Sequence, residues 1–292
     1  MTIAIGTRGS ALALAQSRLV AAALGGDVDL RIIRTTGDTT TAPLFELGDG
    51  VFVMAIEDAL RRGEVDLAVH SLKDLPTAER GDLVIAAIPA RADPRDVLIT
   101  RSRGGLATLP EGAVVGTSSP RRDAFLRAIR PDVTTRPIRG NVDTRLRKVL
   151  EGEYDATVLA AAGLERLGIG FAQVEALDLD SCPPAPGQGA LAIQCRTDDT
   201  ALRARLAPLD DAATRAAVTS ERALLAALGA SCALALGAYA RCIGGRVILD
   251  AAFDDGGLRR SHAEGVDPLA VAAEAAAALR VAAASPAGGA RV

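Results

Sequence analysis

The chain has 292 residues, more than one domain usually contains, so two or three domains are expected. Hydrophobic residues make up 49% of it and charged residues 24%, with a net charge of -3, which excludes an intrinsically disordered chain and a general polyanion-binding surface. Aromatic residues, which form stacking platforms for single-stranded nucleic acid, are only 2% of the chain, so we expect no nucleic-acid partner.

The sequence also argues against a membrane protein and against a metal centre. No apolar run has the length of a membrane span, because Glu274 and Arg280 interrupt the alanine-rich segment near the C-terminus. The N-terminus passes from Met1 directly into an apparent strand, without the basic and apolar regions of a signal peptide. We therefore expect a cytoplasmic protein without a membrane partner. His70 and His262 are the only two histidines, which excludes a three-histidine metal site, and no metal is expected.

The first part of the chain alternates strand and helix patterns. Alternating apolar residues predict strands at 2–6, 28–36 and 65–69, and helical spacing predicts helices at 11–24 and 51–62. This order implies a parallel sheet with right-handed crossovers. The turn after the first strand contains Arg8 and Ser10, and Ser10 can cap the helix so that backbone N–H groups face an anion. Arg8 is either a carboxylate ligand at this turn or an exposed surface arginine.

The stretch from Val65 to Thr77 carries the strongest candidate for chemistry. After the predicted strand come His70 and Ser71, and then Lys73, Asp74 and Pro76 lie where the chain must leave the sheet. Open α/β sheets place their functional groups at the carboxyl ends of strands. We therefore expect Asp74 to be a functional acid. The alternative is that it caps a helix or pairs with Lys73 at the surface.

Further strands are predicted at 83–88 and 96–100, and then a second unit repeats the first arrangement. In residues 113–130 a strand leads to a turn with Thr117, Ser118 and Ser119 and to a helix that begins with Pro120. Arg121 and Arg122 lie just inside this helix, where cations oppose the helix dipole, so either a bound anion or a solvated face accounts for them. Three more arginines follow at or near the later turns: Arg139, Arg145 and Arg166.

These basic residues gather at the strand-to-helix turns of two similar halves. Turns after parallel strands lie at one edge of a sheet, so two facing sheets would line a cleft with cations. A small polycarboxylate or polyphosphate ligand is therefore expected.

The remaining chain predicts a crossing and a third domain. The Pro- and Gly-rich segment 183–190 precedes a last apolar strand that is free to join the first sheet. From Asp211 onward two helices and a strand pattern indicate a smaller α+β domain. Cys232 lies in its first loop, so this thiol is either a buried structural residue or accessible; none of the four cysteines has C-x-x-C spacing.

Several motifs together resemble the porphobilinogen deaminase (hydroxymethylbilane synthase) family. They span nearly the whole chain in the family's order: TRGSALALAQ, AVHSLKDLPT, DPRDVLI, VGTSSPRR, RGNVDTRLRK, YDATVLAAAGLERLG, PAPGQGALAIQCR and GASCALALGAYA. The resemblance implies an α/β fold with two periplasmic-binding-protein-like lobes and a third, smaller α+β C-terminal domain. The expected domains are 1–90 plus 190–208 (the catalytic lobe), 95–185 (the second lobe) and 211–292 (the cofactor-attachment domain).

The resemblance also implies an activity, a cofactor and site residues. The family joins four porphobilinogen molecules head to tail with release of ammonia, and a dipyrromethane cofactor is attached by a thioether to the cysteine that matches Cys232. Asp74 would be the catalytic carboxylate, and a monomer is expected. Other residues implied to hold the cofactor are Ser71, Lys73, Thr117, Ser118, Ser119, Arg121, Arg122 and Arg145. Residues implied to hold the substrate are Arg8, Ser10, Arg139, Arg166 and Gln188.

Some positions depart from the family's pattern. Gly48-Asp49-Gly50-Val51-Phe52 and Met54-Ala55 stand where the family has additional lysines, and Ala230-Ser231 replaces a Gly-Gly pair before the cysteine. Two alternatives therefore remain beside the enzyme: a two-lobed protein that only binds a polyanionic small molecule, and an altered paralogue. Cys232 separates the first alternative from the enzyme, because a pure binding protein has no use for a tethering thiol.

Overall fold

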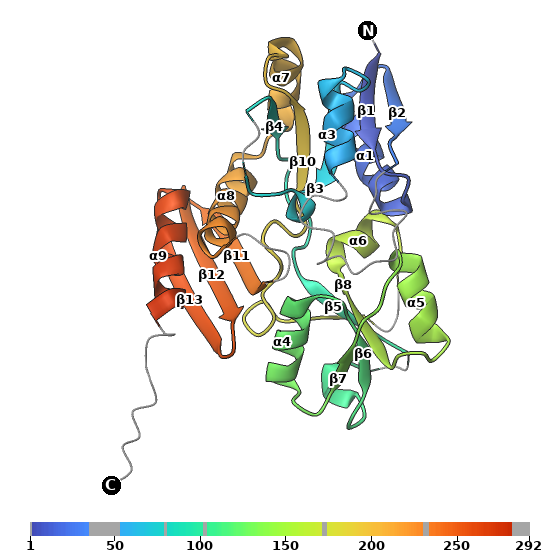
Figure 1. Ribbon diagram of the computed structural model, residues 1–292, viewed down its shortest axis with the longest axis vertical. Coiled ribbons are helices and arrows are strands. Elements are labelled where there is room, and N and C mark those ends of the chain that lie inside the picture. Colours follow the sequence, from blue (N-terminus) through green and yellow to red (C-terminus); the bar gives the residue numbers. More distant parts are fainter. Residues whose placement is uncertain are drawn as a thin grey trace.

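The computed structural model describes residues 2–34, 53–78, 81–101, 104–170, 174–229 and 234–281. These residues form two α/β lobes and a smaller α+β domain beside them (Figure 1). Within the described residues, no helix is long and apolar enough to cross a membrane.

The first lobe is built on a five-stranded sheet of order β2-β1-β3-β10-β4. β1 is parallel to β2 and β3, whereas β10 is antiparallel to β3 and β4. All five residues of β1 are buried, as expected for a strand covered on both faces. The strands are β1 (Ile3–Thr7), β2 (Val28–Ile32), β3 (Leu67–Ser71), β4 (Leu83–Ala87) and β10 (Leu191–Arg196). The helices are α1 (Ala11–Leu24), α3 (Met54–Arg61), η2 (Leu72–Asp74), α7 (Thr200–Leu206) and η4 (Ala207–Leu209).

Two predicted strands of this lobe have different bounds in the structure. β2 ends at Ile32 rather than at residue 36, because its partner β1 ends at Thr7, which is paired with Ile32. β3 runs from Leu67 to Ser71 rather than over 65–69, because β10 pairs with it as far as Ser71. His70 and Ser71 are therefore strand residues, and the chain leaves the sheet directly into η2.

The second lobe has a sheet of order β7-β6-β8-β5-β9. Here β6 is parallel to β7 and β8, and β5 is antiparallel to β8 and β9. The strands are β5 (Asp96–Thr100), β6 (Val114–Gly116), β7 (Thr134–Arg136), β8 (Ala156–Ala160) and β9 (Val174–Ala176). The helices are η3 (Leu106–Thr108), α4 (Pro120–Ile129), α5 (Val142–Leu150) and α6 (Ala161–Arg166).

The two sheets have the same topology, and the chain crosses twice between them. It leaves the first lobe after β4 to form β5 of the second, and it returns after β9 to form β10 of the first. Each lobe thus receives its antiparallel strand directly after a crossing. This confirms the expected two-lobed fold, including the prediction that the last strand joins the first sheet. Except for η4 at residues 207–209, which ends one residue beyond the expected 208, the elements lie within the expected domain ranges, while the domain boundaries themselves stay a prediction.

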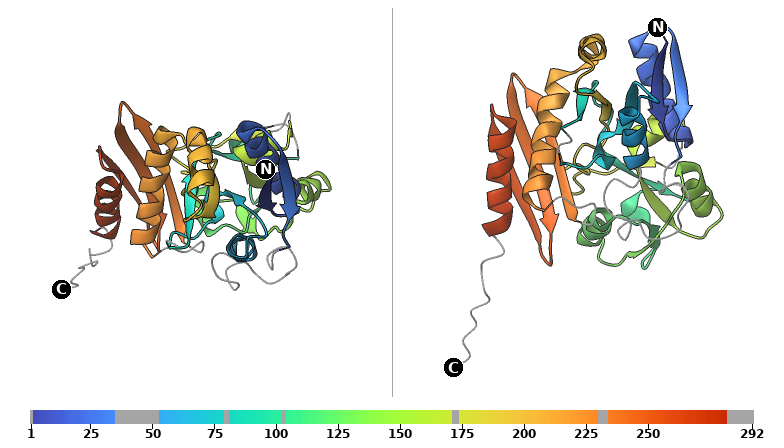
Figure 2. Two further views of the ribbon diagram at one scale, coloured as in Figure 1. Left: turned by 90° about the horizontal axis from the view of Figure 1, so that it is seen from above. Right: turned by 45° about the horizontal axis from the view of Figure 1, so that its top comes forward.

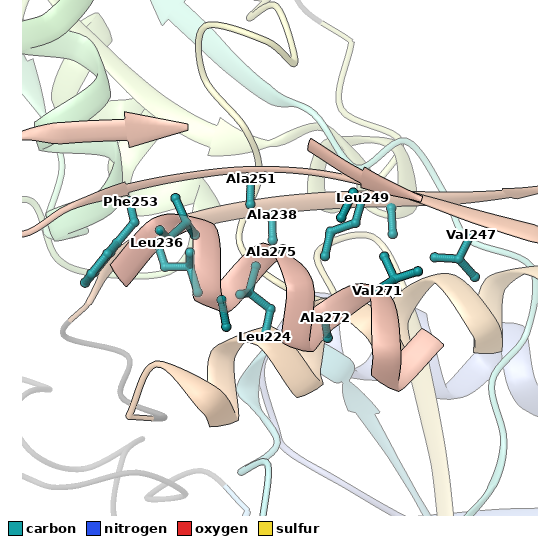
Figure 3. Packing of buried hydrophobic residues seen from close by; sticks show 14 of the residues in the cluster. Leu224, Leu236, Ala238, Val247, Leu249, Ala251, Phe253, Val271, Ala272 and Ala275 are labelled. Carbon is teal, nitrogen blue, oxygen red and sulfur yellow. The ribbon is translucent and has the colours of Figure 1, made fainter. Parts of the chain in front are cut away.

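The third domain lies beside both lobes, with α9 on the side away from them (Figure 2). Its antiparallel sheet consists of β11 (Ala235–Ile243), β12 (Arg246–Asp254) and β13 (Leu258–Gly265), and its helices are α8 (Ala212–Ala227) and α9 (Pro268–Val281). Figure 3 shows side chains of both helices, among them Leu224 and Val271, packed against sheet residues such as Leu236 and Leu249. This core confirms the predicted α+β domain.

The other face of this sheet contacts the crossing that returns to the first lobe. The backbone N–H of Ala238 donates to the carbonyl of Pro184 at 2.8 Å. At Gly237 the approach is so close that a Cβ would lie 2.5 Å from the carbonyl oxygen of Pro183, so only glycine fits there. The third domain is therefore docked on the segment that joins the lobes.

Candidate active site

The turn after β3 places Asp74 at a cavity of the first lobe. Asp74 is exposed and ends η2, a 3₁₀ turn that directly follows the strand. The same cavity is lined by Arg8, Ser10 and Ser71, so the structure brings together four residues predicted for the site. Ser10 caps α1, with its Oγ accepting from the N–H of Ala13 at 3.3 Å, as the sequence predicts.

Lys73 turns toward the crossing between the lobes. Its Nζ donates to Oε1 of Gln188 at 3.2 Å. Burial lowers the pKa of Lys73 to about 8, while the carboxylates of Asp74 and Asp96 oppose this shift. Arg121 and Arg122 of the second lobe also lower this pKa, which shows that cations of both lobes are close enough to repel one another. Lys73 of the first lobe is therefore near Arg121 and Arg122 of the second, while a cation-lined ligand cleft between the sheets stays a prediction.

Asp96 supplies a buried countercharge for the two arginines at the start of α4. Its side chain is fully buried, and its two oxygens accept from Arg121 Nη2 at 2.6 Å and from Arg122 Nη2 at 2.7 Å. Burial alone would raise the pKa of Asp96, but the two guanidinium groups hold it well below its usual value. The sequence left a bound anion and a solvated face as alternatives for Arg121 and Arg122, whereas in the structure a protein carboxylate, that of Asp96, compensates them. Arg122 Nε is buried and has no hydrogen-bond partner among the described residues.

The hydroxyl groups before α4 are engaged in the turn itself. Thr117 Oγ1 accepts from the N–H of Ser119 at 3.2 Å, and Ser119 Oγ accepts from the N–H of Arg122 at 3.4 Å, which caps the helix. Ser118 Oγ donates to the carbonyl of Ile138 and accepts from the N–H of the same residue, at 2.9 and 3.1 Å. These bonds hold the turn next to the segment that carries Arg139.

Arg145 and Arg139 extend the positive charge of the second lobe. Arg145 Nε donates to the carbonyl of Gly140 at 2.8 Å. Burial, together with the charges of Arg122 and Arg139, lowers the pKa of Arg145 to about 10. Because the charges of Arg122 and Arg139 disfavour the charge of the buried Arg145, an anion near Arg145 is favoured. This charge and the unpartnered Arg122 Nε fit a ligand with several carboxylates, such as a dipyrromethane.

Arg166 and Gln188 lie at the crossing. Arg166 Nη2 donates to the carbonyl of Gly189 at 2.6 Å, and burial lowers its pKa. Gln188 is 1% exposed, and besides Lys73 its amide contacts the carbonyl of Pro94 and Oδ1 of Asp96, both at 2.8 Å. Gln188, in the segment that returns to the first lobe, is therefore bonded to the segment that leaves it.

The structure also shows contacts that sequence reasoning missed. Glu221 of α8 is fully buried and accepts from Arg91 at 2.6 and 3.0 Å and from the N–H groups of Gly187 and Ala240, both at 2.7 Å. Arg91 in turn donates to the carbonyl of Gln188 at 2.8 Å. The sequence signal that could have indicated these contacts is that Glu221, a charged residue, lies on the apolar side of the predicted helix. Glu221 thereby ties the third domain to the crossings.

Some predicted positions lie outside the described residues. These are Cys232, the departures at 48–52 and the pair Ala230-Ser231. Met54 and Ala55, which stand where the family has a Lys-Glu pair, begin α3, and Met54 is 54% exposed. The roles assigned to individual site residues stay predictions.

Comparison with known proteins identifies the family. A family model described as "Porphobilinogen deaminase, dipyromethane cofactor binding domain" matches residues 3–204. Porphobilinogen deaminase 1 of Streptomyces coelicolor is 55% identical over 245 residues, which are 81% of this chain and 77% of that protein. The porphobilinogen deaminase of Acidothermus cellulolyticus is 54% identical over 260 residues, 86% of this chain and 78% of that protein.

A distant likeness also appears among solved structures. The periplasmic VFT2 domain of Bordetella pertussis BvgS covers 70% of this chain and 85% of that one, with 16% identity and a TM-score of 0.41. The family match spans more than half of the chain, and the relatives are similar over most of their length. The chain therefore belongs to the porphobilinogen deaminase family.

Proposed function

We propose that the protein is a hydroxymethylbilane synthase. It joins four porphobilinogen molecules head to tail, releases ammonia at each addition, and frees the linear tetrapyrrole by hydrolysis. Family membership supports this activity. The observation that carries the site assignment is the exposed carboxylate of Asp74 at a cavity that also contains Arg8, with further cations contributed by the second lobe.

Asp74 is proposed to be the catalytic residue. Loss of ammonia from the aminomethyl group of porphobilinogen leaves a cationic azafulvene, and a fixed carboxylate beside the pyrrole N–H stabilises that charge better than water does. Asp74 can also donate a proton to the leaving amine and later accept one from the new pyrrole. The 3₁₀ turn holds the carboxylate in place, since η2 follows β3 without an intervening loop.

The cations are proposed to hold the carboxylates of substrate and cofactor. A dipyrromethane, linked through a thioether to Cys232, supplies the acceptor to which the substrate units are added. Lys73 and Arg145 suit its acidic side chains, because burial and neighbouring cations disfavour their charges in the absence of an anion. Arg122 is assigned to the same role through its Nε, which has no hydrogen-bond partner among the described residues. We assign to the same group Ser71, Thr117, Ser118, Ser119 and Arg121, and to the substrate Arg8, Ser10, Arg139, Arg166 and Gln188.

We further propose that the protein works as a cytoplasmic monomer on a small-molecule substrate, without nucleic acid or membrane. The composition supports this, because few aromatic residues and a slightly negative net charge suit neither a nucleic acid nor an anionic membrane surface.

Intact mass and two substitutions, with one control, test the proposal. The purified chain should exceed its sequence mass by one dipyrromethane, and Cys232→Ser should lose both this increment and turnover. Asp74→Asn should keep the increment and lose turnover. Asp58→Asn, which removes a carboxylate of the same lobe that pairs with Arg61 outside the cavity, is the matched control and should stay active. Full activity of Asp74→Asn would exclude the proposed mechanism.

A further inference from the structure

One face of α8, a helix of the third domain, is packed against the turn that carries Asp74. Val218 of α8 is fully buried in a cluster with Leu72 and Leu75, which flank Lys73 and Asp74 on either side. Arg222 lies one helical turn further along α8, on the same face as Val218. The third domain therefore contacts the turn through both an apolar and a charged side chain.

Arg222 donates to three backbone carbonyls of this turn. Its Nη1 lies 2.9 Å from the oxygen of Leu75 and 3.4 Å from that of Leu72, and its Nη2 lies 2.7 Å from the oxygen of Pro76. These carbonyls follow the end of β3, where no neighbouring strand can provide N–H groups for all of them. The planar guanidinium group, with donors in a fixed fork, can bridge carbonyls that are several residues apart.

The charge of Arg222 has no carboxylate partner among the described residues. Burial lowers the pKa of Arg222 below its ordinary value. The three carbonyl dipoles are therefore what compensates a partly desolvated cation. A side chain that only joined two domains could do so with an ion pair at the surface, as Arg215 does on the same helix.

The neighbouring residue fixes the turn from its other side. Glu221 accepts from the N–H of Gly187, and the position that a Cβ of Gly187 would take lies 3.3 Å from the backbone nitrogen of Lys73. The N–H of Leu72 donates to the carbonyl of Ala190 at 3.0 Å in the same crossing. Two consecutive residues of α8 thus hold both the turn and the backbone packed against it.

We propose that Arg222 is a positioning residue of the reaction, which holds the Leu72–Pro76 backbone so that the carboxylate of Asp74 keeps its orientation. The inference rests on the proposed role of Asp74. It assigns the third domain a second task beside carrying Cys232, because α8 also leads to the segment with that cysteine.

The test compares Arg222→Ala with Arg215→Ala in the enzyme as purified. Arg215 is the matched control, since it also joins α8 to the first lobe, through Asp210 and the carbonyl of Ile85, but does not touch the turn. Amide hydrogen exchange over residues 72–78 and steady-state kinetics are measured on both variants, after intact mass has shown equal cofactor content.

For Arg222→Ala we expect exchange in 72–78 to become about tenfold faster, which corresponds to the loss of about one net hydrogen bond. We expect kcat to fall about 10- to 100-fold with KM within about threefold, because the acid is displaced while the cations remain. Arg215→Ala should change neither quantity. Arg222→Lys, which keeps the charge but not the fork, should lie between the wild type and Arg222→Ala in both.

The inference is overturned if Arg222→Ala matches Arg215→Ala in exchange and in kcat, or if KM rises while kcat is kept. Should Arg222→Ala not fold, Arg222→Lys and Arg222→Gln decide by the same two measurements. Asp74→Asn separates this inference from the proposed function: if that variant is inactive while the Arg222 variants behave like the wild type, Asp74 stands and the role of Arg222 fails. An active Asp74→Asn variant would instead remove the proposed function itself.

Discussion

Lys73 donates a hydrogen bond to Gln188, with 3.2 Å between Nζ and Oε1, and this contact joins the turn that carries Asp74 to the crossing between the lobes. The amide of Gln188 also donates to Asp96 at the start of β5. A change in the angle between the lobes would therefore move the side chain of Lys73, which is next to Asp74. This coupling suits an enzyme whose product grows inside one cleft.

Activity should decline as the pH rises through about 8, because burial lowers the pKa of Lys73 to that value and deprotonation removes a cation from the cleft. Lys73→Arg, which keeps its charge, should lose this step in the pH profile of kcat/KM. The pH dependence of folding stability that comes from Lys73 should have the opposite sign to that of activity. Between about pH 8 and 10.5 the unfolded chain binds the additional proton, so stability should rise with pH in that window. An identical activity profile for Lys73→Arg would contradict the assignment.

Asp96→Asn should destabilise the protein by about 3–5 kcal/mol, since it leaves Arg121 and Arg122 with uncompensated buried charge. Urea-induced unfolding at pH 7 measures this. The stabilisation by Asp96 is present above the usual carboxyl pKa and is lost as the pH falls through its lowered value. Asp93→Asn, in the same crossing but paired with Arg95 near the surface, should cost less than about 1 kcal/mol. Equal effects of the two substitutions would count against the buried pairing.

The free energy of unfolding should fall on acidification between about pH 6.5 and 4, with a slope of up to about 1.4 kcal/mol per pH unit from His70. Burial lowers the pKa of His70 to about 4, so the unfolded chain takes up the proton first. His70→Gln should flatten this part of the stability curve. His262→Gln, at an exposed histidine of the third domain, serves as the control, and no difference between the two curves would refute the prediction.

Arg145→Gln should stabilise the protein that lacks its cofactor, but it should reduce the activity of the protein that carries it. In the Cys232→Ser background it should raise the free energy of unfolding, because it relieves repulsion with Arg122 and Arg139. In the loaded enzyme it should lower kcat/KM about 10- to 100-fold, since a charge-assisted hydrogen bond to a carboxylate is lost. Arg147→Gln, on the same helix but exposed and paired with Glu151, should leave kcat/KM unchanged. Destabilisation of the empty protein by Arg145→Gln would argue against an anion site there.

Local patterns predicted most of the elements of the fold. The strand predicted at 96–100 has the bounds found for β5, and Ser10 and Ser119 cap the helices that follow them. These features depend on neighbours within a few residues of the chain. The placement of β3 was wrong by two residues, because its end is set by pairing with β10, which lies more than a hundred residues further along the chain.

Partners distant in sequence could not be predicted. Asp96 pairs with Arg121 across 25 residues, and which acid meets which arginine depends on how β5 and α4 are placed. Arg222 contacts backbone carbonyls about 150 residues away, and carbonyls leave no mark in the sequence because every residue has one. The attachment role of Cys232 was predicted only through the resemblance to the family, since neither the composition of the chain nor the spacing of its cysteines distinguishes Cys232 from the other three.

The return of the chain to supply β10 also constrains the order of synthesis. Translation delivers β1 to β4 early, but the strand that separates β3 from β4 leaves the ribosome only after the whole second lobe. Until then a nascent first lobe exposes two unpaired strand edges, which are sites for mispairing. The second lobe, whose strands all lie between residues 96 and 176, can be completed beforehand. The first lobe, although its first residues are synthesised earliest, is therefore completed after the second lobe.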